Sequence, residues 1–363
     1  MRPVGKLDTG ILKTKQHFEI LDGLRGIAAL AVVTFHFMEI AYSDYSKNFI
    51  GHGFLAVDFF FCLSGFVIAY AYDDRIEKMG MLEFFKSRLI RLHPLVIFGS
   101  ILGLLAFLFD PFGGHLELYS AARIILVFVL SLLLIPFPVV ADRAFNQFSF
   151  NAPAWSLFWE YVANIFYALV LCRLRKSILI VLTIIPAGFV FYVAHSSGNL
   201  MGGWGKGNFW DGCARVSYSF LAGMLVYRLN LTIKNKLSFI GLSVLLVLAF
   251  LMPFSNNWNP LSEPLVVILY FPLLVAMGAG AALAPGLKRF CVLSGKLSYP
   301  LYMTHYAVMW MFGNYYATHK PGTGQLTLII TVGLIILSTF AYLVMVFYDT
   351  PVRNYLNRKR QKG

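Results

Sequence analysis

Apolar stretches of about helix length recur along the whole chain, separated by short polar or basic segments. As helices, most of them reach the ~20 residues needed to cross a hydrocarbon core of roughly 30 Å, and the stretch at 93–109 is marginal. The pattern predicts an all-α fold: a polytopic membrane helix bundle forming a single domain over residues 1–363. The candidate membrane segments lie near residues 20–42, 52–72, 93–109, 121–140, 153–171, 177–195, 212–229, 238–254, 264–284, 297–316 and 326–348.

The basic residues between these stretches test how many of them cross, because cytoplasmic loops of membrane proteins are rich in Lys and Arg. If the N-terminus is cytoplasmic and all eleven stretches cross, the basic clusters at 173–176 and 353–362 fall outside. If one stretch does not cross, both clusters return to the cytoplasm. The best candidate is 121–140, which runs into Pro136 and Pro138.

The preferred topology therefore has about ten transmembrane helices and both termini in the cytoplasm. Residues 1–19 and 350–363 are predicted to be short basic cytoplasmic tails, and a re-entrant or displaced segment is predicted near 111–150. No small-residue cleavage site follows the first apolar stretch, so we expect it to stay as a transmembrane helix and not to be a removed signal peptide.

The composition agrees with a membrane protein and not with a soluble domain. Of the 363 residues, 58% are hydrophobic and only 13% are charged, with a mean hydropathy of +0.70. The formal net charge of +13 comes from basic loops, and without an RNA-binding motif we expect no nucleic-acid partner. The four cysteines are far apart and form no CxxC pair, so we expect no metal and no disulfide framework.

Two titratable side chains lie inside the first apolar stretch. Arg25 and His36 have ten residues between them, which on a helix is about 20° past three full turns and roughly 16 Å along the axis. They therefore share a helix face. Charged or titratable groups inside a bilayer are costly, so such residues indicate a functional site. The predicted topology puts Arg25 toward the cytoplasm and His36 toward the outer leaflet.

Other polar residues in apolar stretches are candidate partners for His36. In the predicted topology Glu160 lies near the depth of His36, and His305 lies near mid-membrane. A histidine with an orienting carboxylate suits acid–base catalysis on a hydroxyl; the alternative is a polar pair that holds helices together. Asp58 also needs a partner, because a carboxylate in lipid is costly. Gly65 predicts close helix packing.

Arg88 and Arg91, three residues apart, lie at the predicted cytoplasmic mouth of the third helix. Together with Arg25 they could hold an anionic ligand, because guanidinium groups bind phosphates bidentately. The alternative is ordinary loop charge of the kind that the positive-inside rule describes. For Arg25, which lies within its apolar stretch, we favour the functional interpretation.

Five segments carry these residues in order along the chain: LDGLRGIAALAVVTFHF (Arg25, His36), VDFFFCLSGFVIAY (Asp58), FFKSRLIRLHPL (Arg88, Arg91), WSLFWEYVANIFY (Trp155, Ser156, Glu160) and GKLSYPLYMTHYAV (Ser298, Tyr302, His305). Together they resemble the acyltransferase-3 family of integral membrane acyltransferases. There are departures from the family pattern. Tyr161 stands where many relatives have a second acidic residue, and Asp349-Thr350-Pro351 stands where many end the last helix in Glu-x-Pro.

The resemblance implies transfer of an acyl group, usually acetyl, from cytoplasmic acyl-coenzyme A to a hydroxyl of a glycan, a lipid-linked saccharide or a similar acceptor. It also implies a multi-pass protein of the bacterial inner membrane, in contact with membrane lipid. Arg88 and Arg91 would hold the donor. Arg25 would either hold its phosphates or polarise its thioester.

We expect His36 to act as general base, or else to carry the acyl group transiently, with Glu160 orienting the imidazole. The rival hypotheses are a transporter or flippase that uses the intramembrane charges as a path, and a non-catalytic scaffold or receptor. The sequence does not predict the acceptor, the acyl chain length or the oligomeric state.

Overall fold

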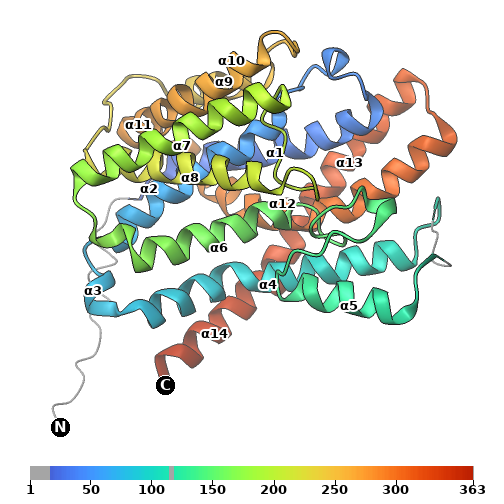
Figure 1. Ribbon diagram of the computed structural model, residues 1–363, viewed down its shortest axis with the longest axis horizontal. Coiled ribbons are helices and arrows are strands. Elements are labelled where there is room, and N and C mark those ends of the chain that lie inside the picture. The colour runs from blue at the N-terminus through green and yellow to red at the C-terminus, as the bar shows by residue number, and fades with distance from the viewer. Residues whose placement is uncertain (1–16, 114–117, 363) are drawn as a thin grey trace.

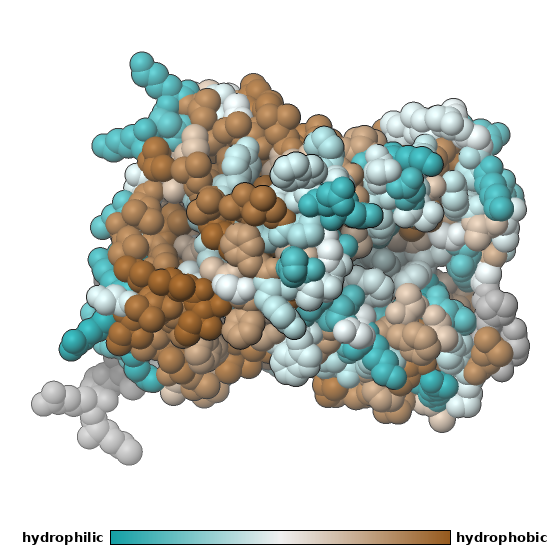
Figure 2. Space-filling model, turned by 45° about the horizontal axis from the view of Figure 1, so that its top comes forward, coloured by the Kyte–Doolittle hydropathy of each residue, from teal (hydrophilic) through white to brown (hydrophobic). Residues whose placement is uncertain are grey.

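The computed structural model describes residues 17–113 and 118–362; most of the predicted N-terminal tail lies outside them. Within the described residues every regular element is a helix, which confirms the all-α prediction, and the long helices run side by side as a bundle (Figure 1). Figure 2 shows hydrophobic side chains gathered over the left half of one face. Toward its right-hand side the same face is hollowed.

Residues 17–113 and 118–197 contain seven α-helices: α1 (Glu19–Ala41), α2 (Ala56–Tyr72), α3 (Ile76–Met79), α4 (Met81–Leu108), α5 (Ala121–Leu132), α6 (Ala154–Leu169) and α7 (Lys176–Ser197). Residues 198–362 contain the remaining seven: α8 (Phe209–Arg228), α9 (Phe239–Phe250), α10 (Asn259–Leu265), α11 (Phe271–Gly280), α12 (Lys288–His319), α13 (Thr323–Val344) and α14 (Thr350–Lys362). Two π-helical turns, Val266–Tyr270 and Met345–Asp349, join α10 to α11 and α13 to α14 without a break.

Six helical segments of the described chain are long and apolar enough to cross a membrane: Glu19–Ala41, Gly53–Tyr72, Met81–Leu108, Lys176–Ser197, Asn259–Gly280 and Thr323–Lys362. Helices α8 and α12 are long as well but carry charged residues, such as the buried Arg215 of α8, which lower their hydropathy. The predicted number of crossings and the cytoplasmic position of the termini stay predictions.

Three helices differ in extent from the predicted apolar stretches. Helix α4 begins at Met81 and not near 93, because its first turns are amphipathic and bury Phe84 while Lys86 faces outward. Helix α5 ends at Leu132, ahead of Pro136, which disfavours a helix interior because it lacks a backbone N–H. The last helix continues through 350–362, where the sequence predicted a tail.

The segment near 111–150 contains one short helix. Helix α5 has 12 residues and is therefore about 18 Å long, well below the roughly 30 Å of a hydrocarbon core. Between α5 and α6 the chain forms only one short 3-10 turn, Ala141–Arg143. This geometry agrees with a displaced segment, which stays a prediction; residues 114–117 lie outside the described chain.

Close helix pairs hold the bundle together and fix the positions of the polar side chains. Gly65 of α2 lies against the backbone carbonyl of Phe220 on α8, and Gly223 of α8 lies against that of Cys62 on α2. A Cβ atom at either glycine would overlap the facing backbone. The predicted close packing at Gly65 is therefore confirmed, and small residues allow it as they do in membrane helices generally.

Candidate active site

Helices α1 and α12 carry five of the eleven predicted site residues, and they pack against each other along their length. Gly26 of α1 lies so close to Ser294 of α12 that a Cβ atom would overlap it. This approach brings His36 and His305 together, with ring centroids 5.3 Å apart and an interplanar angle of 22°. We call the group around them the histidine cluster; it comprises His36, Glu39, Tyr45, His305 and Tyr306.

Glu39, one turn after His36 on α1, is the carboxylate of the histidine cluster. Its Oε1 atom contacts the Nδ1 atom of His36, and its other oxygen accepts a 3.3 Å hydrogen bond from the Tyr45 hydroxyl. The side chains of His36 and Glu39 are each 19% exposed, so they are held firmly yet remain reachable. A carboxylate at Nδ1 favours the tautomer that carries its hydrogen there, which leaves Nε2 free to accept a proton.

His305 is fully buried, and its protonation pattern follows from its neighbour. Its Nδ1 atom lies 3.1 Å from the carbonyl oxygen of Leu301. Because a carbonyl can only accept, Nδ1 carries the hydrogen and Nε2 is an acceptor. Within residues 17–113 and 118–362, Nε2 finds no hydrogen-bond partner. Tyr306 packs edge-on against His36, with centroids 4.9 Å apart; the imidazole of His36 therefore lies between two aromatic rings.

Glu160 does not contact His36, which corrects the predicted pairing. Its Oε1 atom accepts hydrogen bonds from Arg88 at 2.8 Å and from Ser64 at 2.9 Å. The reason is its depth in the bundle. Ser156, one turn before Glu160, bonds to Tyr302, one turn before His305. Since α6 and α12 run in opposite directions here, Glu160 and His305 each lie about 5 Å from this bond, on opposite sides of it.

Four arginines gather at the other end of α1 and form what we call the arginine cluster: Arg25, Arg88, Arg91 and Arg353. Arg91 interacts electrostatically with the other three and with Glu160. Arg88 is buried and Arg91 is exposed, while the side chain of Arg25 is 20% exposed and lies 3.2 Å from Asp22. A dense group of guanidinium donors is suited to a ligand that carries several negative charges. The predicted meeting of Arg25 with Arg88 and Arg91 agrees with this geometry.

Arg353, which the sequence analysis did not select, comes from α14, beside α4 (Figure 1). Its Nη1 atom lies 3.0 Å from the Oδ2 atom of Asp349, within the π-helical turn one helical turn earlier. Asp349 is buried, and its second oxygen has no partner among the described side chains and backbone groups. The shorter acidic residue at this position thus holds an arginine of the cluster.

Hydrogen bonds from α12 connect the two clusters. The Tyr302 hydroxyl lies 2.8 Å from the Ser156 hydroxyl, and the Tyr299 hydroxyl donates to the carbonyl of Leu92 at 2.6 Å. Ser298 donates to the carbonyl of Gly295 at 2.8 Å, within its own helix. Tyr302 and Tyr299 thus fix α12 against α6 and α4, between the histidine and arginine clusters.

Asp58 forms a structural ion pair with Arg215, and Trp155 packs beside that arginine. Neither residue belongs to the histidine cluster or the arginine cluster. Arg215 binds both oxygens of Asp58, the shortest distance being 2.6 Å, and both side chains are buried. Arg215 also donates to the carbonyl of Gly202 at 2.7 Å, and its Cζ lies 5.2 Å from the Trp155 ring centroid. A buried pair with these added bonds satisfies the partner that Asp58 requires. It ties α2 to α8 and to the loop before α8.

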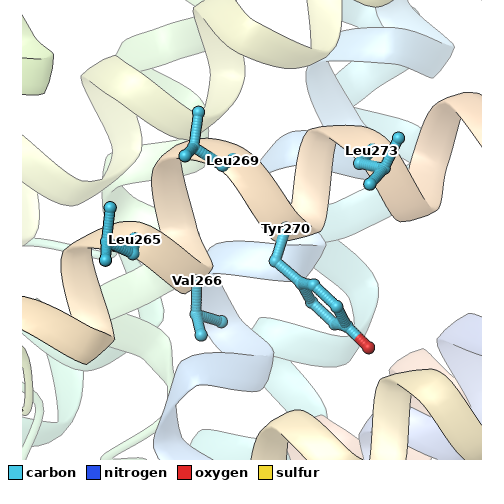
Figure 3. A pocket seen from close by; sticks show the side chains of 5 residues that line it. All are labelled: Leu265, Val266, Leu269, Tyr270 and Leu273. Atoms are coloured by element: carbon cyan, nitrogen blue, oxygen red, sulfur yellow. The ribbon is translucent and has the colours of Figure 1, made fainter.

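One open pocket lies away from these residues, on the segment that joins α10 to α11 (Figure 3). It has a volume of about 280 Å³ and is lined by Leu265, Val266, Leu269, Tyr270 and Leu273. The Tyr270 hydroxyl donates to the carbonyl of Leu245, so the lining offers no free polar group for chemistry. Among residues 17–113 and 118–362, no three His, Cys, Asp or Glu side chains gather as metal ligands would.

Four residues of the two clusters were not predicted from the sequence: Glu39, Tyr45, Tyr306 and Arg353. Glu39 could have been found, because it lies three residues after His36 and such residues share a helix face. Tyr306 directly follows His305, yet nothing in its spacing distinguishes it from the other aromatic residues. Arg353 lies in a stretch that looked like an ordinary basic tail.

Comparison with known proteins gives the context for this geometry. The acyltransferase domain model of the acyltransferase-3 family matches residues 18–347. The O-acetyltransferase OatA of Staphylococcus aureus (strain NCTC 8325 / PS 47) is 26% identical over 365 aligned residues, covering 92% of this chain and 57% of OatA. This chain therefore spans little more than half of OatA. No solved structure matches.

Two further relatives match shorter parts of the chain. Protein 2 in the picA locus of Rhizobium radiobacter is 34% identical over 164 residues, which is 42% of this chain and 82% of that protein. The putative peptidoglycan O-acetyltransferase YrhL of Bacillus subtilis is 36% identical over 104 residues, which is 26% of this chain and 15% of YrhL. The family match over most of the chain, together with the apolar helices, identifies the protein as an integral membrane acyltransferase of the acyltransferase-3 family.

Proposed function

We propose that this acyltransferase moves an acetyl group from acetyl-coenzyme A to a hydroxyl of a glycan at the bacterial inner membrane. The observation that carries the proposal is the pair of clusters on α1. An arginine cluster suited to a polyanionic donor lies roughly 16 Å from a histidine whose Nδ1 contacts a carboxylate. The names of OatA and YrhL support acetyl as the group and a glycan as the acceptor.

The arginine cluster binds the phosphates of the donor in this proposal. Arg91 is exposed and its guanidinium is not taken by an ion pair within the described chain, so it is the first candidate for a phosphate contact. Arg88 is held by Glu160 at 2.8 Å. Glu160 therefore acts by positioning Arg88, a role that replaces the contact with His36 predicted from the sequence. Arg25 binds phosphate in the same group.

The histidine cluster performs the transfer. The Nε2 atom of His36 accepts the proton of the acceptor hydroxyl while the hydroxyl oxygen forms a bond to the acyl carbon. The carbon–sulfur bond of the thioester then breaks, and the thiolate of coenzyme A takes the proton from the imidazolium. Glu39 fixes the ring and stabilises its positive charge during the step. His305 holds the plane of the ring by stacking.

The residues between the clusters keep this geometry rigid. The hydrogen bond between Ser156 and Tyr302 joins α6 to α12 near the histidine cluster, and Tyr299 joins α12 to α4 near the arginine cluster. Ser298 donates a hydrogen bond within α12, and Trp155 packs against the guanidinium of Arg215. Positioning of this kind lowers the barrier because the reacting groups are held in place before the step.

The test uses purified protein in lipid nanodiscs with radiolabelled acetyl-coenzyme A and membrane saccharides extracted from cells that lack the gene. Wild-type protein should release coenzyme A and label the saccharides. His36→Ala should lose labelling, while His195→Ala, an exposed histidine on α7, should retain it. Normal labelling by His36→Ala would contradict the mechanism. Saccharide movement without release of coenzyme A would favour a transporter.

A further inference from the structure

Arg143 is a buried cation outside the two clusters. It ends the 3-10 turn between α5 and α6, and only 4% of the residue is exposed. Its Cζ atom lies 4.5 Å from the ring centroid of Trp310 and 5.4 Å from that of Phe107. Within residues 17–113 and 118–362, no carboxylate lies within ion-pair distance of it. A buried charge is costly unless a partner compensates it.

The negative charge that interacts most strongly with Arg143 does not fill that role. Asp110 has the largest charge interaction with Arg143, yet its carboxylate already accepts hydrogen bonds from Asn314 at 2.7 Å and from the backbone N–H of Phe112 at 3.0 Å. Arg143 lies in a loop, where burial lowers its pKa to about 10. The guanidinium is therefore positive at neutral pH and faces aromatic rings in place of an anion.

A row of aromatic side chains leads from Arg143 to His36. The Trp310 ring lies 5.2 Å from Tyr306, and Tyr306 lies 4.9 Å from His36. Tyr306 and Trp310 are four residues apart on α12 and share one face. The indole Nε1 atom of Trp310 is buried and has no hydrogen-bond partner in the described part of the chain. In the described part of the chain, the indole N–H of Trp310 has no acceptor and lies beside the guanidinium of Arg143, which has no carboxylate partner.

These groups match the chemistry of an anionic saccharide. Aromatic rings offer flat apolar faces with a polar edge, the indole N–H can donate to a hydroxyl or ring oxygen, and a guanidinium binds a carboxylate or phosphate through two parallel hydrogen bonds. A sugar lying along Tyr306 and Trp310 would have one end near Nε2 of His36. Its negative group would then lie near Arg143.

We propose that Arg143, Trp310 and Tyr306 form an acceptor subsite that recognises a saccharide by a negative group, either a uronic acid carboxylate or a glycosyl phosphate. The inference rests on the proposed function, because it takes His36 as the site of transfer. It adds the substrate class: an anionic glycan is preferred over its neutral counterpart.

The test measures binding to purified protein in nanodiscs by titration calorimetry. The probes are a hyaluronan tetrasaccharide, its carboxyl-reduced form, N-acetylglucosamine 1-phosphate and N-acetylglucosamine. Wild-type protein should bind at least one anionic probe about tenfold more tightly than its neutral counterpart, as expected for a charge-assisted hydrogen bond. A preference confined to the tetrasaccharide pair identifies a carboxylate, and one confined to the phosphate pair identifies a phosphate.

Variants separate recognition from folding. Arg143→Gln should lose the preference and Arg143→Lys should keep part of it, while Arg173→Gln, an exposed arginine elsewhere, should match wild type. Monodisperse elution in detergent checks the fold of each variant. Equal binding of charged and neutral probes by wild type, or a preference that survives in Arg143→Gln, would overturn the subsite.

Consumption of acetyl-coenzyme A, measured on the same samples, separates this inference from the proposed function. Protein that binds the anionic probes through Arg143 but consumes no acetyl-coenzyme A would refute the proposed transfer and leave the subsite intact. Protein that consumes the donor but shows no preference that depends on Arg143 would refute the subsite alone.

Discussion

The carboxylate of Glu39 contacts the Nδ1 atom of His36 one helical turn earlier on α1. In the proposed mechanism, two residues of one helix form the base and its orienting carboxylate. Glu160, the carboxylate that the sequence favoured, binds Arg88 instead. Substitutions of Glu39 and Glu160 are therefore expected to change different kinetic parameters: the rate of transfer for Glu39 and the KM for the donor for Glu160.

Glu39→Gln should lower the rate of transfer at saturating donor by about 10²–10⁴-fold, the range that a positioned general base contributes. Gln keeps the size of the side chain but removes the charge that stabilises the imidazolium. The KM for acetyl-coenzyme A should change little, because Glu39 lies far from the arginine cluster. Steady-state release of coenzyme A measures both quantities. Glu77→Gln, an exposed carboxylate on α3, is the matched control, and a Glu39→Gln rate close to wild type would exclude the orienting role.

Glu160→Gln should weaken donor binding and stability together. It leaves the buried Arg88 without its carboxylate, and breaking a buried ion pair by removing one partner costs about 3–5 kcal/mol; partial exposure of Glu160, at 20%, puts this variant at the lower end. The KM for acetyl-coenzyme A should rise and the thermal midpoint in detergent should fall. The double variant with Arg88→Gln should recover part of the lost stability. An unchanged midpoint in Glu160→Gln would mean that the pair contributes nothing.

Arg91→Gln and Arg353→Gln should each raise the KM for acetyl-coenzyme A by roughly tenfold or more, since a hydrogen bond to a charged group contributes about 1.5–3 kcal/mol. Arg358→Gln, an exposed residue of α14, should leave the KM unchanged. Donor titrations at several salt concentrations should show a steeper salt dependence in wild type than in the variants. Equal KM values for Arg353→Gln and Arg358→Gln would remove Arg353 from the donor site.

Asp58→Asn should reduce stability without a specific effect on turnover. It leaves Arg215 buried with no compensating charge, a loss of about 3–5 kcal/mol, and should lower the yield of folded protein. Turnover per folded molecule should stay near wild type, because Asp58 belongs to neither cluster. Thermal unfolding and active-site titration distinguish these effects. A stable Asp58→Asn protein with no turnover would show that Asp58 takes part in the transfer reaction.

Gly65→Ala should destabilise the bundle by about 1–3 kcal/mol, as overpacking does in well-packed cores, because the new Cβ overlaps the Phe220 carbonyl. Gly313→Ala on α12 is the matched control, since a Cβ there meets no atom within 4 Å, and it should be neutral or slightly stabilising. Thermal midpoints in detergent compare the two. Similar midpoints for both variants would show that α2 and α8 can separate at little cost.

The sequence predicted the helices well because an apolar stretch of membrane length has few structural alternatives. The predicted helix boundaries were wrong where a helical segment is not apolar. The polar first turns of α4 and the basic residues of α14 are helical without being apolar. Helix ends at such places depend on packing against neighbours, which a hydropathy pattern does not contain.

The site was predictable where one helix determines the geometry. Arg25 and His36 needed only the helical repeat, and the structure places them at opposite ends of α1. Pairs between helices were harder, because depth depends on where each helix begins. An error of about two turns in the depth of α6 separates Glu160 from His36 and places it beside Arg88. Asp58 was correctly expected to need a partner, and only the fold could identify Arg215, which follows it by 157 residues.

The unbroken course of α1 from Arg25 to His36 has a consequence for donor choice. In the proposed mechanism Arg25 binds the phosphates of the donor and His36 acts at its acyl group, and the single helix between them holds these two residues at one separation. In this mechanism the enzyme therefore selects donors by the length of the arm between their phosphates and their thioester. Donors with a shortened or lengthened pantetheine arm should bind with normal affinity yet present their thioester away from His36, and selection among them should act on turnover and not on occupancy.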